Sequence, residues 1–519
     1  MKLTKSKTML LMLSMLSILC IIFMATQKKG MILDEYFSYG LANSTYEGNH
    51  GKYCIYLPQG EVVDSKAFFD NYFFASKISV KNVWLNQGYD VHPPVYYLLL
   101  HLFGRMTGNV LGFDTGIVLN LLLHIINIVL IYCLIQQIIK DKFWAYLGVA
   151  WYAFLPIVID YVLYIRMYYL LITWILLISL WMIKGVDQRG SKIRFYVGLA
   201  IISALGVLTH YYFVVYLFYL CMLWGIYLLI KRNWKEIVAF FFTMGAAGIS
   251  CLIIFPAMKY HILHGNRGQE SINSLLHSNY LDFLGFYKNV LNHLAGGILL
   301  IFVLSGIFAL IYVGKKYRAK ISDKTVWKYL LIVFPVLMFY LSVSKIGVMH
   351  HSRFITPIFG TMIIVLTSFL CALHMLLKNR NIGKIIAGII VVAVLWIEWQ
   401  GYQWVDLSRD DSEGISIASE YGKENDCFYI YRDSEHSMVS YDEFIKYDQI
   451  CFWKMDTPPE QMKAVLDNYE HLVVYFDVNG TMSKEEQTDY LDRMLEQSES
   501  MSKYTHLYDG TTNSAYYLE

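Results

Sequence analysis

Residues 88–100, GYDVHPPVYYLLL, combine candidate chemistry with a strong structural signal. Asp90 and His92 stand just before Pro93-Pro94, and an apolar run follows. Proline locks φ and restricts the residue before it, so the diproline predicts a rigid, extended backbone ahead of a helix. That helix, residues 95–107, is too short to cross a bilayer, and we expect it to lie along the membrane face.

Upstream in the same loop, Asp34 and Glu35 follow the first apolar span. One reading is a pair of solvated loop acids. However, the aromatic run Tyr36–Leu41 follows them directly, which favours partial desolvation at the membrane. Desolvation raises a carboxyl pKa and makes the group a better base, whereas the nearby Lys28 and Lys29 act in the opposite sense. The loop 28–113 therefore brings two acids and a histidine to a membrane face.

The composition is that of a polytopic membrane protein. Hydrophobic residues make up 56% of the 519 residues and charged residues 16%, with a mean hydropathy of +0.42. Eight cysteines lack CxxC spacing, so the sequence predicts no metal or redox motif and no cofactor, although Cys427 and Cys451 could pair.

About eleven helical spans are predicted from the apolar runs. They are residues 8–27, 114–139, 143–160, 166–184, 195–209, 211–230, 236–256, 294–313, 327–343, 354–377 and 384–403. The first span follows three lysines and lacks a clear small-x-small cleavage site, which favours a retained anchor over a cleaved signal peptide.

Alternate loops are rich in Lys and Arg and share their sign with the N-terminus. The positive-inside rule then predicts a multi-pass protein of the cell membrane with a cytoplasmic N-terminus. The loop 28–113 and the residues after the last span fall on the outer side.

Two domains are predicted, a membrane domain over residues 1–404 and a soluble, extracytoplasmic one over residues 405–519. The second carries a net charge of −16 and the first one of +18. Apolar β-type runs at 427–431 and 472–476 and a helical run at 459–469 predict a small α/β fold. The fold class is therefore a mainly α membrane bundle with a small C-terminal α/β domain.

Arg166 and Arg353 both stand where an outer loop meets a span. Either could be an interfacial arginine that snorkels. Their planar fork also suits a phosphate, because it forms bidentate hydrogen bonds. The adjacent His350-His351 pair predicts no metal site, since neighbouring histidines rarely share one ion. His210, at a short outer turn, could be a helix-end histidine with no further role.

These residues together resemble the polyprenyl-phosphate-sugar-dependent glycosyltransferases of the GT-C superfamily, in particular bacterial relatives of protein O-mannosyltransferases and aminoarabinose transferases. The likeness covers roughly residues 8–375. The matching motifs are Asp34-Glu35, Asp90 to Tyr97 with Val95 in place of leucine, Arg166-Met167-Tyr168, Thr209 to Tyr212, and the late Arg353. One departure is Leu163-Tyr164, where relatives often carry an acid or amide.

The resemblance implies an inverting transfer of sugar from a polyprenyl phosphate to an acceptor hydroxyl of a glycan, lipid or protein at the outer face. In that scheme Asp34, with Glu35 beside it, supplies the catalytic base, and Arg166 or Arg353 neutralises the leaving phosphate. The implied substrate-binding residues are Asp90, His92, Pro93, Arg166, Tyr168, His210, Tyr211 and Arg353. Asp34 and Asp90 could hold a divalent cation, although the scheme does not require one. No nucleic-acid partner is expected.

Two other classes stay open. A lipid-linked-oligosaccharide polymerase or ligase is also polytopic but relies on outer arginines and histidines, and the Asp-Glu pair argues against it. A glycolipid transporter or flippase should place ionisable groups at mid-membrane. Here Lys, Arg, Asp and Glu gather near one face instead.

Overall fold

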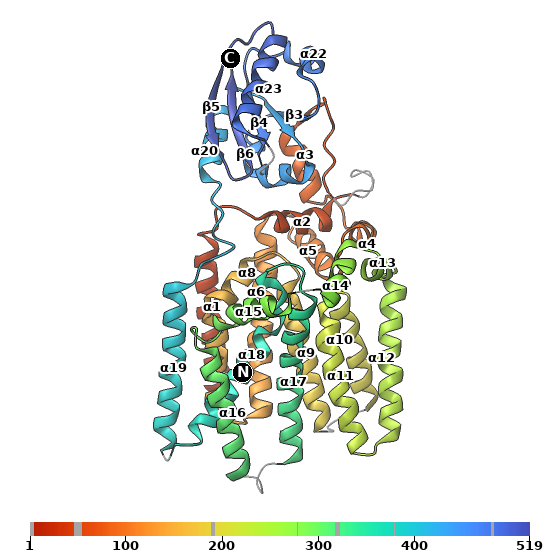
Figure 1. The fold of residues 1–519 in the computed structure, drawn as a ribbon, viewed down its shortest axis with the longest axis vertical. Helices are drawn as coiled ribbons and strands as arrows, with labels where there is room; N and C mark the ends of the chain where they lie inside the picture. The colour runs from red at the N-terminus through yellow and green to blue at the C-terminus, as the bar shows by residue number, and fades with distance from the viewer. Residues whose placement is uncertain are drawn as a thin grey trace. The chain divides into compact units, whose positions relative to one another are not determined.

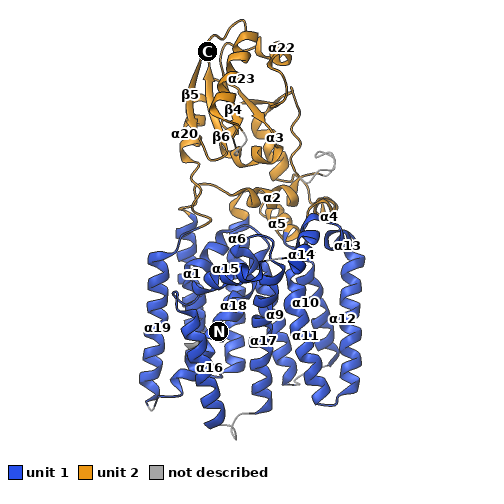
Figure 2. Ribbon diagram, viewed as in Figure 1, with its two compact units in different colours: residues 1–25, 91–96, 116–404 blue, residues 26–90, 97–115, 405–519 orange. Residues whose placement is uncertain are grey.

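The chain divides into two compact units in the computed structural model (Figure 2). The structure describes residues 5–45, 54–187, 192–277, 279–316, 322–377, 379–478 and 482–519. Unit 1 comprises residues 1–25, 91–96 and 116–404, and unit 2 comprises residues 26–90, 97–115 and 405–519. The division after residue 404 falls where the predicted domains meet. The loop 28–113, predicted within the membrane domain, is instead grouped largely with the C-terminal residues.

Unit 1 is built from helices that run side by side (Figure 1). Its longer helices are α1 (Lys5–Ala25), α6 (Asp114–Ile138), α7 (Lys142–Phe154), α9 (Tyr168–Val186), α10 (Lys192–Val207), α11 (Tyr212–Ile230), α12 (Trp234–Ile254), α16 (Leu299–Lys316), α17 (Asp323–Ile346), α18 (Phe359–His374) and α19 (Arg380–Gly401). Shorter ones are α8 (Pro156–Leu163), α13 (Ala257–Leu263), α14 (Asn266–His277), α15 (Tyr280–Asn292) and the 3₁₀ turns η2 (Ser352–Phe354) and η3 (Thr356–Ile358).

Nine helices in the described ranges are long and apolar enough to cross a membrane, or ten if α7 and α8 form one bent span. The two differ in direction by 57° at Pro156, because a proline cannot continue the hydrogen bonding of the helix before it. The remaining predicted span, 195–209, corresponds to α10, whose 16 residues are fewer than the ~20 that a helix needs to cross a bilayer. The chain is thus an integral, multi-pass membrane protein.

The two ends of the helices in unit 1 differ in chemistry. The 19 residues of α9 separate Tyr168 from Val186 by about 27 Å at ~1.5 Å per residue. Just past Val186, Lys328 Nζ lies 2.8 Å from Asp187 and contacts the carbonyl of Gln137 at 3.5 Å. Lys328, Asp187 and Gln137 therefore lie at one end of the bundle, and the candidate site residues near Tyr168 lie at the other.

Unit 2 holds a six-stranded sheet and its covering helices (Figure 1). The strands are β1 (Val62–Asp64), β2 (Cys427–Tyr431), β3 (Gln449–Lys454), β4 (Leu472–Asp477), β5 (Tyr504–Asp509) and β6 (Asn513–Leu518). The helices are α2 (Leu33–Asn43), α3 (Ser65–Phe73), α4 (Val80–Tyr89), most of α5 (Val95–Met106), α20 (Ser412–Tyr421), α21 (Tyr441–Phe444), α22 (Lys463–Leu466) and α23 (Lys484–Gln497), with 3₁₀ turns η4 (Ser434–Ser440) and η5 (Pro459–Met462).

The strand order is β1-β3-β2-β4-β6-β5, with β3, β2 and β4 parallel and the remaining pairings antiparallel. Alternate side chains of the central strands pack under α23, whose Leu491 and Met494 are fully buried. On the other face, Phe444 packs against Tyr429 and Tyr475. The predicted α/β fold is confirmed.

The first loop contributes to this sheet directly. Val62, Val63 and Asp64 of β1 pair with Cys451, Ile450 and Gln449 of β3. Next to β1, Phe68 and Phe69 of α3 pack on Phe452 of β3. Hydrogen bonding and aromatic packing together explain why the loop belongs to unit 2. Cys427 and Cys451 lie on neighbouring strands as free thiols, so the suggested disulfide is not formed.

Candidate functional site

Three of the predicted site residues in unit 1 form an aromatic cluster. The His92 and His210 ring centroids lie 5.7 Å apart, and those of His210 and Tyr168 lie 5.2 Å apart. His92 precedes the diproline, Tyr168 begins α9, and His210 lies in the turn between α10 and α11. Val95 N–H donates to Leu208 O at 3.0 Å, which fixes the end of the diproline segment beside that turn.

His210 is a neutral hydrogen-bond donor in this arrangement. Burial lowers its pKa well below the usual range, and the nearby His92 and Arg166 lower it further. Its Nδ1 accepts the Tyr212 backbone N–H at 3.0 Å, so the ring proton resides on Nε2. The imidazole can therefore offer an N–H to an anionic oxygen without itself being charged.

Arg353 joins this cluster through Tyr164. Its Nη1 donates to the Tyr164 hydroxyl at 3.0 Å, and the Tyr164 ring stacks near that of Tyr168 with centroids 6.2 Å apart. The neighbouring Ser352 hydroxyl lies 2.7 Å from the hydroxyl of Tyr161, which ties the η2 turn to α8. Burial lowers the pKa of Arg353 to about 10, so the guanidinium stays charged at neutral pH.

Arg166 is 5% exposed and lies in the short break between α8 and α9. Its backbone N–H donates to Tyr164 O at 2.9 Å, which holds the break in shape. The structure therefore brings His92, Arg166, Tyr168, His210 and Arg353 to one end of the bundle. Buried cations surrounded by aromatic rings can hold a phosphate strongly, because the low local dielectric strengthens each interaction.

Unit 2 holds the three predicted acids. Glu35 is fully buried, with its carboxylate 2.6 Å from Lys28 Nζ and accepting the Ile32 N–H at 3.1 Å. It therefore caps the first turn of α2. Asp34, next to it in the same turn, is partly exposed. Asp90 caps the C-terminal end of α4, where its N–H donates to Asn86 O at 3.2 Å.

Two predicted substrate-binding residues have other surroundings. The Tyr211 hydroxyl lies 2.9 Å from Nδ1 of His261, which connects it to α13. Pro93 lies in the short bent segment between α4 and α5, where the sequence had predicted an extended backbone, and its side chain can neither donate nor accept a hydrogen bond. Within the described ranges, no group of three or more His, Cys, Asp or Glu residues is arranged to hold a metal ion.

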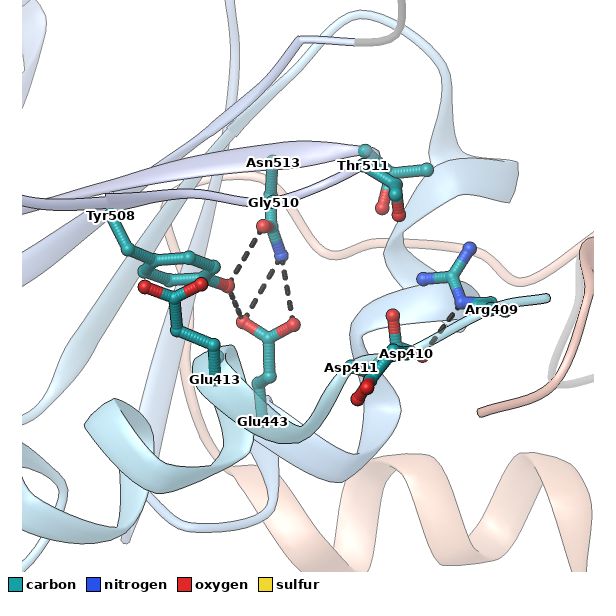
Figure 3. A pocket seen from close by; sticks show the side chains of 11 residues that line it. Arg409, Asp410, Asp411, Glu413, Glu443, Tyr508, Gly510, Thr511 and Asn513 are labelled. Atoms are coloured by element: carbon teal, nitrogen blue, oxygen red, sulfur yellow. Dashed lines mark hydrogen bonds and ion pairs between the residues drawn. The ribbon is translucent and has the colours of Figure 1, made fainter. Parts of the chain in front are cut away.

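A polar hollow lies within unit 2 (Figure 3). Glu443 is 5% exposed at its base, where Tyr508 donates a hydrogen bond to its carboxylate and Asn513 Nδ2 donates another at 3.1 Å. Burial raises the pKa of Glu443 to about 7. On the other side of the hollow, Arg409 Nε lies 2.6 Å from Asp411, whose pKa burial also raises.

Sequence reasoning missed Tyr164 and Glu443. Tyr164 was noted as a departure from a family pattern, yet its hydroxyl is the Arg353 partner, and the two are 189 positions apart. Glu443 lies in a stretch with several other acids, and nothing local distinguishes a buried acid from a solvated one there. The sequence holds no signal that would have revealed either contact.

The family model described as dolichyl-phosphate-mannose-protein mannosyltransferase matches residues 91–260, about a third of the chain. This range contains His92, Arg166, Tyr168 and His210. No curated protein sequence matches the chain.

Several solved structures share the fold. ArnT from Cupriavidus metallidurans in the apo state has a TM-score of 0.56 at 10% identity, covering 98% of this chain and 97% of that one. The same protein bound to undecaprenyl phosphate gives 0.54 at 9% identity with the same coverage. The Archaeoglobus fulgidus oligosaccharyltransferase in the apo form gives 0.51 at 10% identity, covering 95% and 71%. The likeness runs through the whole chain, sheet unit included.

Proposed function

We propose that this chain, whose GT-C fold is confirmed, transfers a sugar from a polyprenyl-phosphate donor to an acceptor hydroxyl. The observation that carries the proposal is the cluster of His92, Arg166, Tyr168, His210 and Arg353 at one end of the helical bundle. The family match over residues 91–260 supports it, and so does the fold shared with a protein solved with undecaprenyl phosphate.

The cluster would bind the donor phosphate. Arg166 and Arg353 each offer a planar fork that matches two phosphate oxygens, and their charge stabilises the phosphate as it leaves. The His210 Nε2–H adds a neutral donor. The Tyr164 hydroxyl accepts a hydrogen bond from Arg353 and so restrains the guanidinium.

Asp34 is the proposed general base, and Glu35 the residue that positions it. Glu35 already accepts from Lys28 and from the Ile32 N–H, whereas Asp34 projects from the same helical turn and is partly exposed. The acceptor oxygen bonds to the anomeric carbon while its proton passes to Asp34. The bond from that carbon to the phosphate oxygen breaks, polyprenyl phosphate leaves, and the anomeric configuration inverts.

Asp90 and His92 are proposed to orient the sugar or its phosphate. The diproline between them and α5 limits how far this segment can move. Asp34 and Asp90 are the carboxylates that would hold a divalent cation, which the scheme does not require. We place the reaction on the outer face, with the N-terminus cytoplasmic, because the basic residues Lys184 and Lys328 lie at the opposite end of α9 from Tyr168.

The test uses the purified full-length chain in nanodiscs with a panel of undecaprenyl-phosphate sugars and a mixture of cell-envelope acceptors. We expect transfer from one donor, with the opposite anomer in the product. Asp34→Asn should lower turnover by roughly 10²–10⁴-fold, the range typical of lost base catalysis. Glu61→Gln, an exposed acid of the same loop, is the matched control and should leave turnover unchanged.

Donor binding without release of polyprenyl phosphate would favour a carrier over an enzyme. Turnover of Asp34→Asn within a few-fold of the parent would remove Asp34 from the mechanism while leaving the transferase proposal intact.

A further inference from the structure

Gln87, in the last turn of α4, has a buried amide without a hydrogen-bond partner. Its side chain is fully buried. Neither its Nε2 nor its Oε1 is hydrogen-bonded to any residue that the structure describes. An amide removed from water in this way costs free energy, since both its donor and its acceptor lose their hydrogen bonds to solvent.

The neighbouring Asn86 is held in the structure through its Nδ2, although its Oδ1 has no hydrogen-bond partner among the described residues. Asn86 is 2% exposed, and its Nδ2 donates to Leu41 O at 3.2 Å, to Ser44 O at 3.0 Å and to Ser44 Oγ at 3.2 Å. Asn86 thus joins α4 to the end of α2. Gln87 has a longer side chain on the same buried side of α4, yet it makes none of these contacts.

The position of Gln87 connects it with the proposed site. Residues three apart on a helix share a face, so Gln87 lies on the same face as Asp90 at the end of α4. The helix on which α4 packs is α2, and α2 carries Asp34. A side-chain amide suits neighbouring hydroxyls, because it can donate a hydrogen bond to one and accept a hydrogen bond from another.

We propose that Gln87 hydrogen-bonds hydroxyl groups of the transferred sugar and contributes to the choice of sugar. The inference rests on the proposed function, because it assumes a sugar-bearing donor. A site built to hydrogen-bond a substrate hydroxyl discriminates against analogues that lack it, since its own buried polar groups would then stay unpaired. Such a site keeps a buried polar group without a partner until the ligand binds, as the amide of Gln87 is in the ligand-free protein.

The experiment compares Gln87→Met with the parent and with Asn86→Leu in purified full-length protein. Methionine matches the length of glutamine and removes both polar atoms. Dissociation constants are measured by titration calorimetry for undecaprenyl phosphate and for whichever undecaprenyl-phosphate sugar of a panel the parent binds best. Melting temperatures of all three proteins are measured without ligand.

We expect Gln87→Met to melt at or above the parent temperature and to bind the sugar-bearing donor about three- to tenfold more weakly per lost hydrogen bond. Its affinity for undecaprenyl phosphate should stay within about twofold of the parent, because phosphate and lipid contacts are unaffected. Asn86→Leu should melt lower, since it loses structural hydrogen bonds.

Three results would overturn the inference. A lower melting temperature for Gln87→Met would mean that the amide has a structural partner. Equal weakening for both lipids would mean an indirect effect on the fold. Unchanged affinity for the sugar-bearing donor would mean that Gln87 does not contact the sugar. A parent that binds no sugar-bearing lipid better than undecaprenyl phosphate would instead refute the proposed function, and this inference with it.

Discussion

Glu443 in unit 2 and Arg353 in unit 1 are both largely removed from water and bonded to a tyrosine, but their pKa values shift in opposite directions. Each is at least partly buried, and each is hydrogen-bonded to a tyrosine hydroxyl, from Tyr508 and Tyr164 respectively. Burial favours the neutral form of both, which raises the pKa of Glu443 to about 7 and lowers that of Arg353 to about 10. Glu443 therefore titrates near neutral pH, whereas Arg353 keeps its charge. A half-buried arginine bonded to a phenol stays charged, whereas a buried glutamate bonded to a phenol changes its charge near neutral pH.

The largest expected effect is a difference in thiol labelling between the two sides of the membrane. It shows on which side Glu443 lies, and therefore the pH to which Glu443 is exposed. A cysteine at Asn468, exposed in unit 2, should react with an impermeant thiol reagent in intact cells. A cysteine at Lys324, exposed at the start of α17, should not react until the membrane is permeabilised. The parent chain, whose cysteines lie in helices of unit 1 or buried in unit 2, gives the background. The reverse labelling pattern would invert the proposed topology.

The next effect is the pH dependence of stability that Glu443 causes. Its folded pKa of about 7 exceeds the ordinary value of 4.5, so the folded state binds the proton more tightly. The protonated carboxyl of Glu443 therefore stabilises the folded state fully below about pH 4.5. This contribution to the free energy of unfolding, about 3 kcal/mol in all, is lost as the pH rises through 7. Glu443→Gln should remove this loss, and its melting temperature should exceed that of the parent more at pH 8 than at pH 5.

Glu470→Gln provides the control, because it makes the same change of charge at an exposed position. Its melting temperature should follow that of the parent at each pH. If Glu443→Gln also follows the parent, the carboxyl of Glu443 is ionised in the folded state throughout this range, and the contrast with Arg353 disappears.

The smallest expected effect tests the arginine. Arg353→Lys retains a charge but loses the planar fork, and we expect about a tenfold loss of donor affinity and transfer rate, with a larger loss for Arg353→Ala. The same two changes at Arg166 show whether one or both arginines serve the phosphate. The measurement is transfer with a purified polyprenyl-phosphate sugar. If lysine matches arginine in transfer rate at both positions, the arginines are interfacial residues and do not form the proposed bidentate hydrogen bonds with the phosphate.

Local sequence patterns predicted the helical bundle and the central strands well. Long apolar runs have few alternatives to a span, and a parallel strand buried on both faces reads as a continuous apolar run, as Cys427–Tyr431 and Leu472–Asp477 do. The predicted helical run at 459–469 was less accurate, because it forms a 3₁₀ turn followed by only one helical turn. The break at Pro156 was also missed, although the proline itself is the signal.

Non-local contacts were not predictable in this way. The three residues of β1 have no strand pattern of their own, and only their pairing with β3 defines them as a strand. The residues of the candidate cluster were named from the sequence. The hydrogen bond between Arg353 and the Tyr164 hydroxyl was not predicted. Likewise, the loop that carries Asp34 was assigned to the membrane domain, because its partners follow it by several hundred residues.

That pairing also has a consequence for synthesis. Asp64 of β1 pairs with Gln449 of β3, so 385 further residues must be translated before the partner strand exists. At about 5–20 residues per second this takes roughly 20–80 s. During that time Phe68, Phe69 and the edge of β1 lack the surface on which they pack in the finished protein. The first loop therefore needs protection from aggregation, and the helix that carries Asp34 reaches its final packing late in biogenesis.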